Sequence, residues 1–164
     1  MKGKTYIIAE VGVNHDGDIL KAVELINKAK ESGADCVKFQ TFRASKIATP
    51  ISPKAEYQLK VTDKKESQLE MLKKLELTYN DFKFLNSKCK EIKIDFMSTP
   101  YSFEDIDFLS SLDVKYLKIA SGQLSEIEFI NYACSKNKEI GIKTKAPHIK
   151  IDAVTFSFFL LLIL

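Results

Sequence analysis

Six polar side chains stand at or just after the ends of short apolar runs that are typical of buried strands. Two of these runs, VKFQ and LKIASG, carry a lysine, and a third ends in MSTP. A lysine in an apolar strand is costly unless an anion or a carboxylate neutralises its charge. The six residues are Glu10, Lys38, Gln40, Thr99, Lys118 and Ser121.

The chemistry of these side chains is that of a site for an anionic ligand. Glu10 can neutralise one lysine. Two lysines, the hydroxyl groups of Thr99 and Ser121 and the backbone N–H groups of the ASG turn form a cup of donors that suits a phosphate or a carboxylate. A single lysine at a strand end is more often a surface residue that lays its stem along apolar side chains. The repetition at four successive strand ends favours a site.

The elements that must position these residues alternate along the chain. The hydrophobic pattern predicts strands at 5–11, 35–40, 94–98, 116–120 and 138–142. It predicts helices at 18–32, 66–77 and 78–93, and two more that begin at the capping motifs SFED (102–105) and SEIE (125–128). Such alternation predicts an α/β fold with a parallel sheet, either an open doubly wound sheet or a (β/α)8 barrel.

Strand alternation decides which of these side chains share a face of the sheet. If Lys38 points toward a barrel axis, Cys36 and Gln40 point there with it, while Phe39 faces the helices. The same parity turns Lys118 toward the axis. Because the carboxyl ends of parallel strands meet at one end of the sheet, the polar residues are expected to gather there.

Other candidates carry weaker signals. The polar stretch 42–65 is too long for a simple connector and is expected to be a functional loop over one end of the fold. His15, in the turn NHDGD, is either a site residue or an ordinary loop histidine. Since His148 is the only other histidine in the sequence, the spacing indicates no metal cluster.

Composition limits the class of protein. With 164 residues, 45% of them hydrophobic, the chain is long enough for one globular domain. Its net charge of +3 is small and its lysines are spread along the sequence, which argues against a nucleic-acid binder. The N-terminus lacks the apolar stretch of a signal peptide, and three widely spaced cysteines without a CxxC motif fit reduced, buried thiols. We therefore expect a cytoplasmic protein.

The last residues form a distinct apolar tail. The run from 154 to 164, VTFSFFLLLIL, carries no charge. It has about half of the apolar length that a membrane-spanning helix needs. We therefore expect no membrane association, and a membrane-anchored fragment is the alternative that the tail leaves open.

Five motifs in a fixed order resemble one family closely. They are EVGVNHDGD, CVKFQTF, SQLEMLKKLEL, FMSTPYS and YLKIASGQ. In this order they resemble the N-terminal catalytic barrel of the sialic acid synthases, which include N-acetylneuraminate synthase and its legionaminate and pseudaminate relatives. The resemblance runs from about residue 5 to residue 139 and is closer to the N-acetylneuraminate and legionaminate branch. It implies a (β/α)8 TIM barrel, of which this sequence holds the N-terminal half, about four to five βα units.

The resemblance also implies a reaction and a set of residues. Synthases of this family are transferases that condense phosphoenolpyruvate with N-acetylmannosamine or a related amino sugar, releasing phosphate and forming a nine-carbon 2-keto acid. They need a divalent metal, manganese or magnesium. Glu10 matches the acidic residue between the enolpyruvate carbon and the sugar, where it can handle a proton or orient water. The positions that bind phosphoenolpyruvate or lie beside it match Lys38, Gln40, Thr99, Lys118 and Ser121.

The resemblance ends after KNKE, residues 136–139. The family continues with a strand of the form PIIxSTG and with strands that carry two metal-binding histidines, and neither is found in this sequence. The C-terminal domain that covers the partner's site in the family homodimer is not found either. We therefore expect 1–139 to be half a barrel and 140–164 to be a divergent tail from a frameshift or truncation. The alternative is a noncatalytic half-barrel that binds phosphate-type anions or pairs with another chain.

Overall fold

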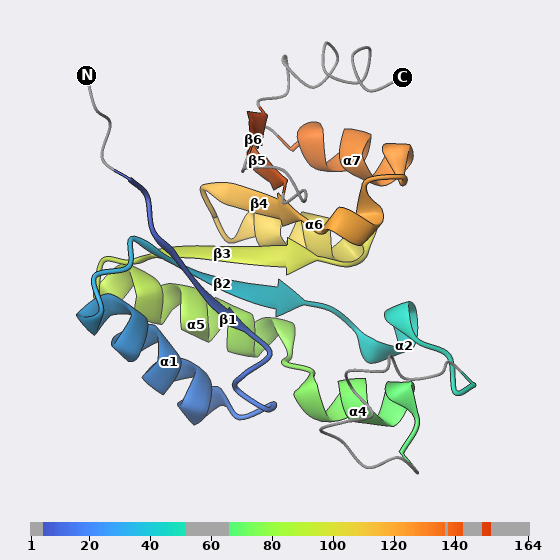
Figure 1. Cartoon of the computed structure of the whole chain (residues 1–164), viewed down its shortest axis with the longest axis horizontal. Helices are drawn as coiled ribbons and strands as arrows, with labels where there is room; N and C mark the ends of the chain where they lie inside the picture. The colour runs from blue at the N-terminus through green and yellow to red at the C-terminus, as the bar shows by residue number, and fades with distance from the viewer. Residues whose placement is uncertain (1–4, 52–65, 137, 143–148, 152–164) are drawn as a thin grey trace.

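The computed structural model describes residues 5–51, 66–136, 138–142 and 149–151, which form one sheet with helices packed along it (Figure 1). The order of the strands in the sheet is their order in the sequence. They are β1 (Ile8–Gly12), β2 (Cys36–Thr41), β3 (Asp95–Pro100), β4 (Tyr116–Ile119), β5 (Glu139–Ile142) and β6 (Ile149–Ile151). Neighbours from β1 to β5 are parallel, which confirms the predicted α/β fold and is the strand arrangement of a (β/α)8 barrel. β6 departs from that pattern, because it runs antiparallel to β5.

Most of the helices begin at residues that can cap them. The helices are α1 (Ile19–Glu31), α2 (Ala44–Ile47), α4 (Gln68–Leu75), α5 (Tyr79–Glu91), α6 (Phe103–Ser111) and α7 (Ile127–Cys134), with a 3₁₀ turn at η1 (Ser121–Gln123). Thr78 and Ser102 accept hydrogen bonds from backbone N–H groups in the first turns of α5 and α6, as the sequence predicts. The predicted cap at Ser125 is wrong. The turn that starts at η1 continues past it, with the N–H of Glu126 donating to the carbonyl of Gln123, and Glu126 is the residue that precedes α7.

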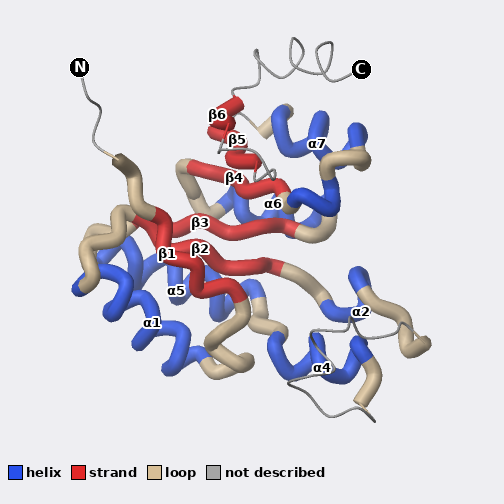
Figure 2. Tube along the Cα trace, in the orientation of Figure 1, coloured by secondary structure: helices blue, strands red, loops and turns tan. Residues whose placement is uncertain are grey.

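A short helix lies in the stretch 42–65 that the sequence predicts as a loop. This helix, α2, has four residues, too few to show a helical period in the sequence. It packs against α4, and both lie beyond the carboxyl end of β2 (Figure 2). The remainder of the predicted loop, 52–65, lies outside the described residues.

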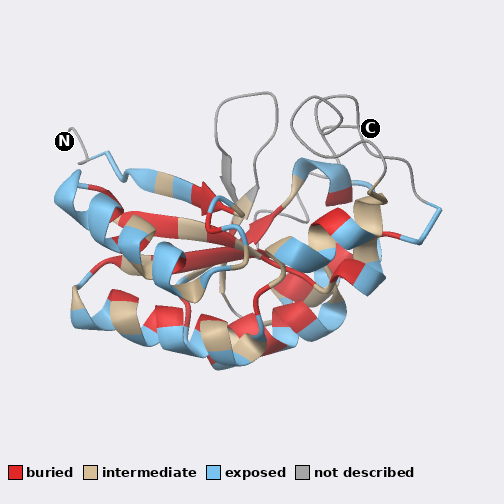
Figure 3. Ribbon diagram, turned by 90° about the horizontal axis from the view of Figure 1, so that it is seen from below, coloured by how far each residue is buried: buried red, intermediate tan, exposed pale blue. Residues whose placement is uncertain are grey.

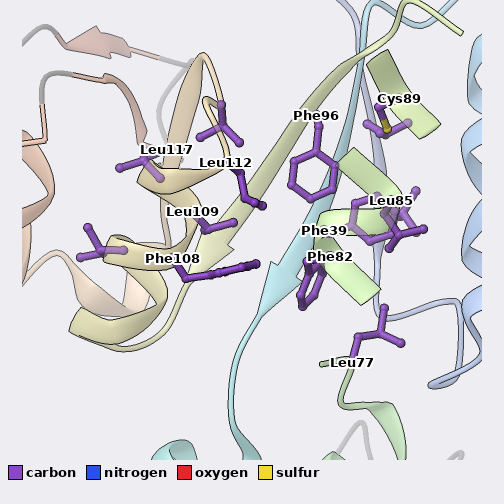
Figure 4. Close-up of a cluster of buried hydrophobic side chains, with 14 of the residues drawn as sticks. Phe39, Leu77, Phe82, Leu85, Cys89, Phe96, Phe108, Leu109, Leu112 and Leu117 are labelled. Carbon is purple, nitrogen blue, oxygen red and sulfur yellow. The ribbon is translucent and has the colours of Figure 1, made fainter. Parts of the chain in front are cut away.

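The core fills the space between the sheet and the helices (Figure 4). Phe39 of β2 stacks on Phe96 of β3 with ring centroids 5.5 Å apart, and it meets Phe82 of α5 edge to face at 6.4 Å. Phe108 of α6 extends the same cluster. Phe39 therefore faces the helices, as the strand parity predicts, and Lys38 lies on the opposite face of the sheet.

Burial divides the helices into two sides (Figure 3). Buried residues gather on the sheet and on the helix sides that face it, and exposed residues lie on the outside. β1 differs, because its edge has no neighbouring strand among the described residues: Ile8 is 43% exposed, and Ile7, just before the strand, is 53% exposed. Within the described segments, no helix is long and apolar enough to cross a membrane.

Candidate active site

Glu10 and Lys38 form an ion pair at the carboxyl end of the sheet. They are register partners on β1 and β2, just before a bulge that separates Glu10 from Gly12. The carboxylate of Glu10 contacts the ammonium group of Lys38. The Lys38 side chain is only 13% exposed, whereas that of Glu10 is 53% exposed. Glu10 therefore neutralises one of the two strand lysines, as its position in the sequence suggests.

Gly12 allows Glu10 and Gln40 to lie together. Its backbone has φ +55°, in the left-handed region that favours glycine. A Cβ atom at this position would lie 3.2 Å from Oε1 of Glu10 and 3.7 Å from Nε2 of Gln40. The side chains of Glu10 and Gln40 therefore both lie close to the backbone of Gly12. This places the side-chain amide of Gln40 near the ion pair.

Thr99 and Lys118 continue the row of polar residues across the sheet. Gln40 pairs in register with Thr99, and Ser98 pairs with Leu117, so that Thr99 and Lys118 occupy neighbouring positions on β3 and β4. Both are buried, with Lys118 only 8% exposed. The ammonium group of Lys118 donates to the backbone carbonyl of Ile119. The structure thus places a second, buried ammonium group two strands away from Lys38.

Ser121 and Gln40 lie in the wall of a cleft of about 880 Å³. Ser121 begins η1, directly after β4, and the far wall of the cleft is α4. The apolar side chains of the wall come from Val13, Phe42, Ile47, Met71, Leu72, Leu75 and Ala120. The polar ones come from Asn14, Gln40, Gln68, Tyr101, Ser121 and Gln123. The other four predicted site residues are not part of this wall, and they lie on the strands whose ends it covers.

Reasoning from the sequence missed four polar residues of the cleft: Asn14, Gln68, Tyr101 and Gln123. Asn14 and Tyr101 follow β1 and β3 closely, and Gln123 lies two residues after Ser121. The rule that finds Thr99, namely that polar residues at strand ends gather at one end of the sheet, applies to these three as well. Gln68 carries no such signal, because it comes from a helix that reaches the cleft only in the folded chain.

His15 is buried in the turn after β1. It is 1% exposed, and its ring lies 6.1 Å from that of Phe39. Its Nδ1 accepts a hydrogen bond of 3.1 Å from the N–H of Gly17. Burial lowers the pKa of the imidazole, so His15 is neutral at pH 7. It is not among the described residues that line the cleft.

The described residues do not provide a metal site. Nowhere in these segments do three His, Cys, Asp or Glu side chains come together closely enough to hold a metal ion. Cys36 and Cys89 are buried, and burial raises the pKa of each thiol to about 12, which leaves them protonated. His148 lies outside the described residues. We therefore assign no described residue as a ligand of the metal that the resemblance implies.

Comparison with known proteins places this geometry in a family. The family model described as "NeuB family" matches residues 25–150. The N,N'-diacetyllegionaminic acid synthase of Legionella pneumophila is 46% identical over 139 residues, which cover 85% of this chain and 39% of that protein. The protein of the same name from Campylobacter jejuni is 45% identical, over 86% of this chain and 42% of that protein.

A solved structure agrees with these matches. The crystal structure of N-acetylneuraminic acid (sialic acid) synthetase from Leptospira borgpetersenii superposes with a TM-score of 0.71 at 25% identity, covering 88% of this chain and 46% of that one. The chain thus spans less than half the length of each of these relatives. Since the family model covers most of the sequence and the fold agrees, the chain belongs to the NeuB family.

Proposed function

We propose that this chain binds phosphoenolpyruvate and condenses it with N-acetylmannosamine or a related amino sugar, a step of sialic acid-type biosynthesis. The observation that carries the proposal is a pair of poorly exposed lysines on β2 and β4, on the same face of the sheet. The side chain of Lys38 is 13% exposed, and Lys118 is 8% exposed. The names of the relatives, which are legionaminic and sialic acid synthases, support the same reaction.

The charges of phosphoenolpyruvate suit this arrangement. The molecule carries a phosphate and a carboxylate, and two poorly exposed ammonium groups attract both more strongly than they would in water. Thr99 and Ser121 add hydroxyl groups, and Gln40 adds an amide beside Glu10. We assign Lys38, Gln40, Thr99, Lys118 and Ser121 to the binding of phosphoenolpyruvate.

The cleft suits the sugar. Its described polar side chains are amides and hydroxyl groups without charge, and its other walls are apolar. Amide side chains form hydrogen bonds with acetamido and hydroxyl groups, and apolar walls pack against methyl groups. We therefore place the amino sugar in the cleft, with its aldehyde toward the strand ends.

The proposed reaction uses these groups in three steps. Carbon C3 of phosphoenolpyruvate forms a bond to the aldehyde carbon, and the aldehyde oxygen takes up a proton to become a hydroxyl group. Water adds to C2, and the C2–O bond to phosphate then breaks to leave the 2-keto acid and inorganic phosphate. We assign Glu10 as the base that takes a proton from this water. In the free protein Glu10 is paired with Lys38, and the phosphate competes for that lysine. Binding of phosphoenolpyruvate therefore frees the carboxylate for its role.

The proposal also includes the metal, the oligomeric state and the cellular location of the reaction. The resemblance implies a divalent metal, manganese or magnesium, and a homodimer. Three free cysteines are consistent with the reducing cytoplasm, where we place the reaction. Gel filtration of the purified protein tests the dimer.

The test is an assay of phosphate release. Phosphoenolpyruvate, N-acetylmannosamine and Mn²⁺ are mixed with the protein, and phosphate and the 2-keto acid are measured by colour reaction and mass spectrometry. We expect phosphate release that requires the sugar and is lost in Lys118→Met. The matched control is Lys28→Met, since Lys28 is a 66% exposed lysine on α1. Equal release by the wild type and Lys118→Met, or no release by the wild type, would contradict the proposal.

A further inference from the structure

A single carboxylate behind the cleft joins two of its walls. Glu76 follows the last residue of α4, and its side chain is 23% exposed. One carboxylate oxygen accepts from Nη1 of Arg43 at 2.8 Å, and the other accepts from the N–H of Ala44 at 2.8 Å. Phe42 precedes this segment and Ile47 ends α2, and both line the cleft. Glu76 therefore fixes the connection between β2 and α2 to the end of α4.

Arg43 also contacts α5, through Tyr79. Its guanidinium group lies 4.6 Å from the centre of the Tyr79 ring, within the range of a cation–π contact. The Tyr79 ring stacks on Phe108 of α6 with centroids 4.0 Å apart. The hydroxyl group of Tyr79 donates to Oδ1 of Asp105 at 2.7 Å. Burial, followed by the hydrogen bond to Asp105, raises the pKa of Tyr79, so the hydroxyl group stays protonated and remains a donor.

Asp105 contacts a third part of the cleft wall, the segment that holds Tyr101. It lies in the first turn of α6 and is fully buried. Its Oδ2 accepts from the hydroxyl group of Ser102 at 2.8 Å and from the N–H of Tyr101 at 3.3 Å. Tyr101 lines the cleft and meets Phe42 edge to face, with ring centroids 6.1 Å apart. The contacts thus link two cleft residues, Phe42 and Tyr101, through side chains behind the cleft. We call this set of contacts, which runs through Glu76, Arg43, Tyr79 and Asp105, the circuit.

The circuit does not include the lysines of the sheet. Lys38 on β2 contacts Glu10, and Lys118 on β4 donates to the carbonyl of Ile119. Burial of the Asp105 carboxylate costs free energy. We therefore expect its contacts to fix one arrangement of the chain and not only to add stability. We expect substitutions in the circuit and substitutions of the lysines to affect different parts of the site.

We propose that Glu76 and Tyr79 are positioning residues that set the shape of the sugar side of the cleft. Glu76 holds the segment of Phe42 and Ile47, and Tyr79, through Asp105, holds Tyr101. Neither residue lines the cleft. The identity of the ligand on this side rests on the function proposed above, whereas the positioning of the two segments does not.

The variants Glu76→Gln and Tyr79→Phe test the two parts of the circuit. Both keep the size of the side chain, so the fold is expected to survive. Glu91→Gln is the matched control, because Glu91 is a 64% exposed glutamate at the end of α5. Hydrogen exchange measured by mass spectrometry reports on residues 42–48 and 101–103. We expect exchange to rise about ten-fold in 42–48 for Glu76→Gln and in 101–103 for Tyr79→Phe, with β2 to β4 unchanged.

Ligand binding separates positioning from general loosening. With phosphoenolpyruvate and N-acetylmannosamine as probes in calorimetry, we expect the affinity for the sugar to fall about five-fold or more in both variants while that for phosphoenolpyruvate stays within about two-fold. Unchanged exchange in both segments, or an equal loss of both affinities, would overturn the positioning role. If the wild type bound no phosphoenolpyruvate, the proposed function would fail, and the exchange pattern would still decide whether Glu76 and Tyr79 position the walls.

Discussion

Glu10 and Lys38 are register partners on adjacent strands and form an ion pair at the carboxyl end of the sheet. The side chain of Lys38 is mostly buried and that of Glu10 is half exposed, so the carboxylate is the solvent-accessible partner of the pair. The charge of Lys38 is thus balanced before any ligand arrives. An anionic ligand must compete with Glu10, and this competition makes the roles of the two residues separable by mutation.

The variant Glu10→Gln separates binding from chemistry. Without the competing carboxylate, Lys38 is fully available to phosphate, and we expect the affinity for phosphoenolpyruvate to rise about three-fold or more. Phosphate release in the presence of the sugar is expected to fall about 100-fold, because the base is lost. Calorimetry and the phosphate assay measure the two effects. Glu24→Gln, on the exposed side of α1, is the control, and weaker binding of phosphoenolpyruvate to Glu10→Gln would contradict the competition.

Lys118→Met tests whether the buried lysine is retained for function. Burial of an ammonium group costs free energy, and methionine has a similar length without charge. We expect the free energy of unfolding in urea to stay the same or to rise by about 1 kcal/mol. A loss of more than about 2 kcal/mol would mean that the contacts of Lys118, including that to the carbonyl of Ile119, stabilise the fold.

Gly17→Ala tests the contact between the β1–α1 turn and α4. Gly17 has φ +75°, and a Cβ atom there would lie 2.1 Å from the carbonyl oxygen of Lys74. Gly33 has a similar φ of +81°, yet a Cβ atom there would meet nothing within 4 Å. We expect Gly33→Ala to lower the free energy of unfolding by about 1 kcal/mol from backbone strain alone. Gly17→Ala is expected to cost about 2 kcal/mol more, because the turn and α4 must separate.

If Gly17→Ala and Gly33→Ala lowered the free energy of unfolding in urea equally, the proposed contact between the β1–α1 turn and α4 would be contradicted. A change at Gly17 is also expected to reach the cleft, since Met71, Leu72 and Leu75 of α4 form its far wall.

His15 makes stability depend on pH. Burial lowers its pKa in the folded protein below the ordinary value of 6.5, so the unfolded chain takes up a proton at a higher pH than the folded chain does. The free energy of unfolding is therefore expected to fall as the pH drops below 6.5 and to level off above it. In His15→Asn, whose side-chain oxygen can still accept from the N–H of Gly17, this fall is expected to be smaller. Identical profiles for the wild type and His15→Asn, measured by urea unfolding between about pH 5 and 8, would contradict it.

Much of the sheet and of its polar face follows from local sequence signals. Alternating apolar runs mark each of β1 to β5, and the capping residues Thr78 and Ser102 mark α5 and α6. The pairing of Glu10 with a strand lysine follows from their positions at two strand ends. These features depend on residues close together in sequence or on the strict parity of strands.

The cleft could not be predicted as fully, because its walls meet only in the folded chain. α2 has no period that a pattern can reveal, and Gln68 reaches the site through the packing of α4. The circuit from Glu76 to Asp105 joins residues that are far apart in sequence and carry ordinary helix-end chemistry. The predicted cap at Ser125 is wrong because a turn beyond η1 includes Ser125, and Glu126 is the residue that precedes α7.

Calorimetric titration with phosphoenolpyruvate tests the central claim most directly. The proteins are the wild type, Lys38→Met, Lys118→Met and the exposed control Lys28→Met. The expected result is binding to the wild type and the control, with affinity reduced about ten-fold or more in each of the other two variants, because each loses one charge-assisted contact to the anion. Equal affinity in all four proteins, or no binding to the wild type, would contradict an anion site built on Lys38 and Lys118.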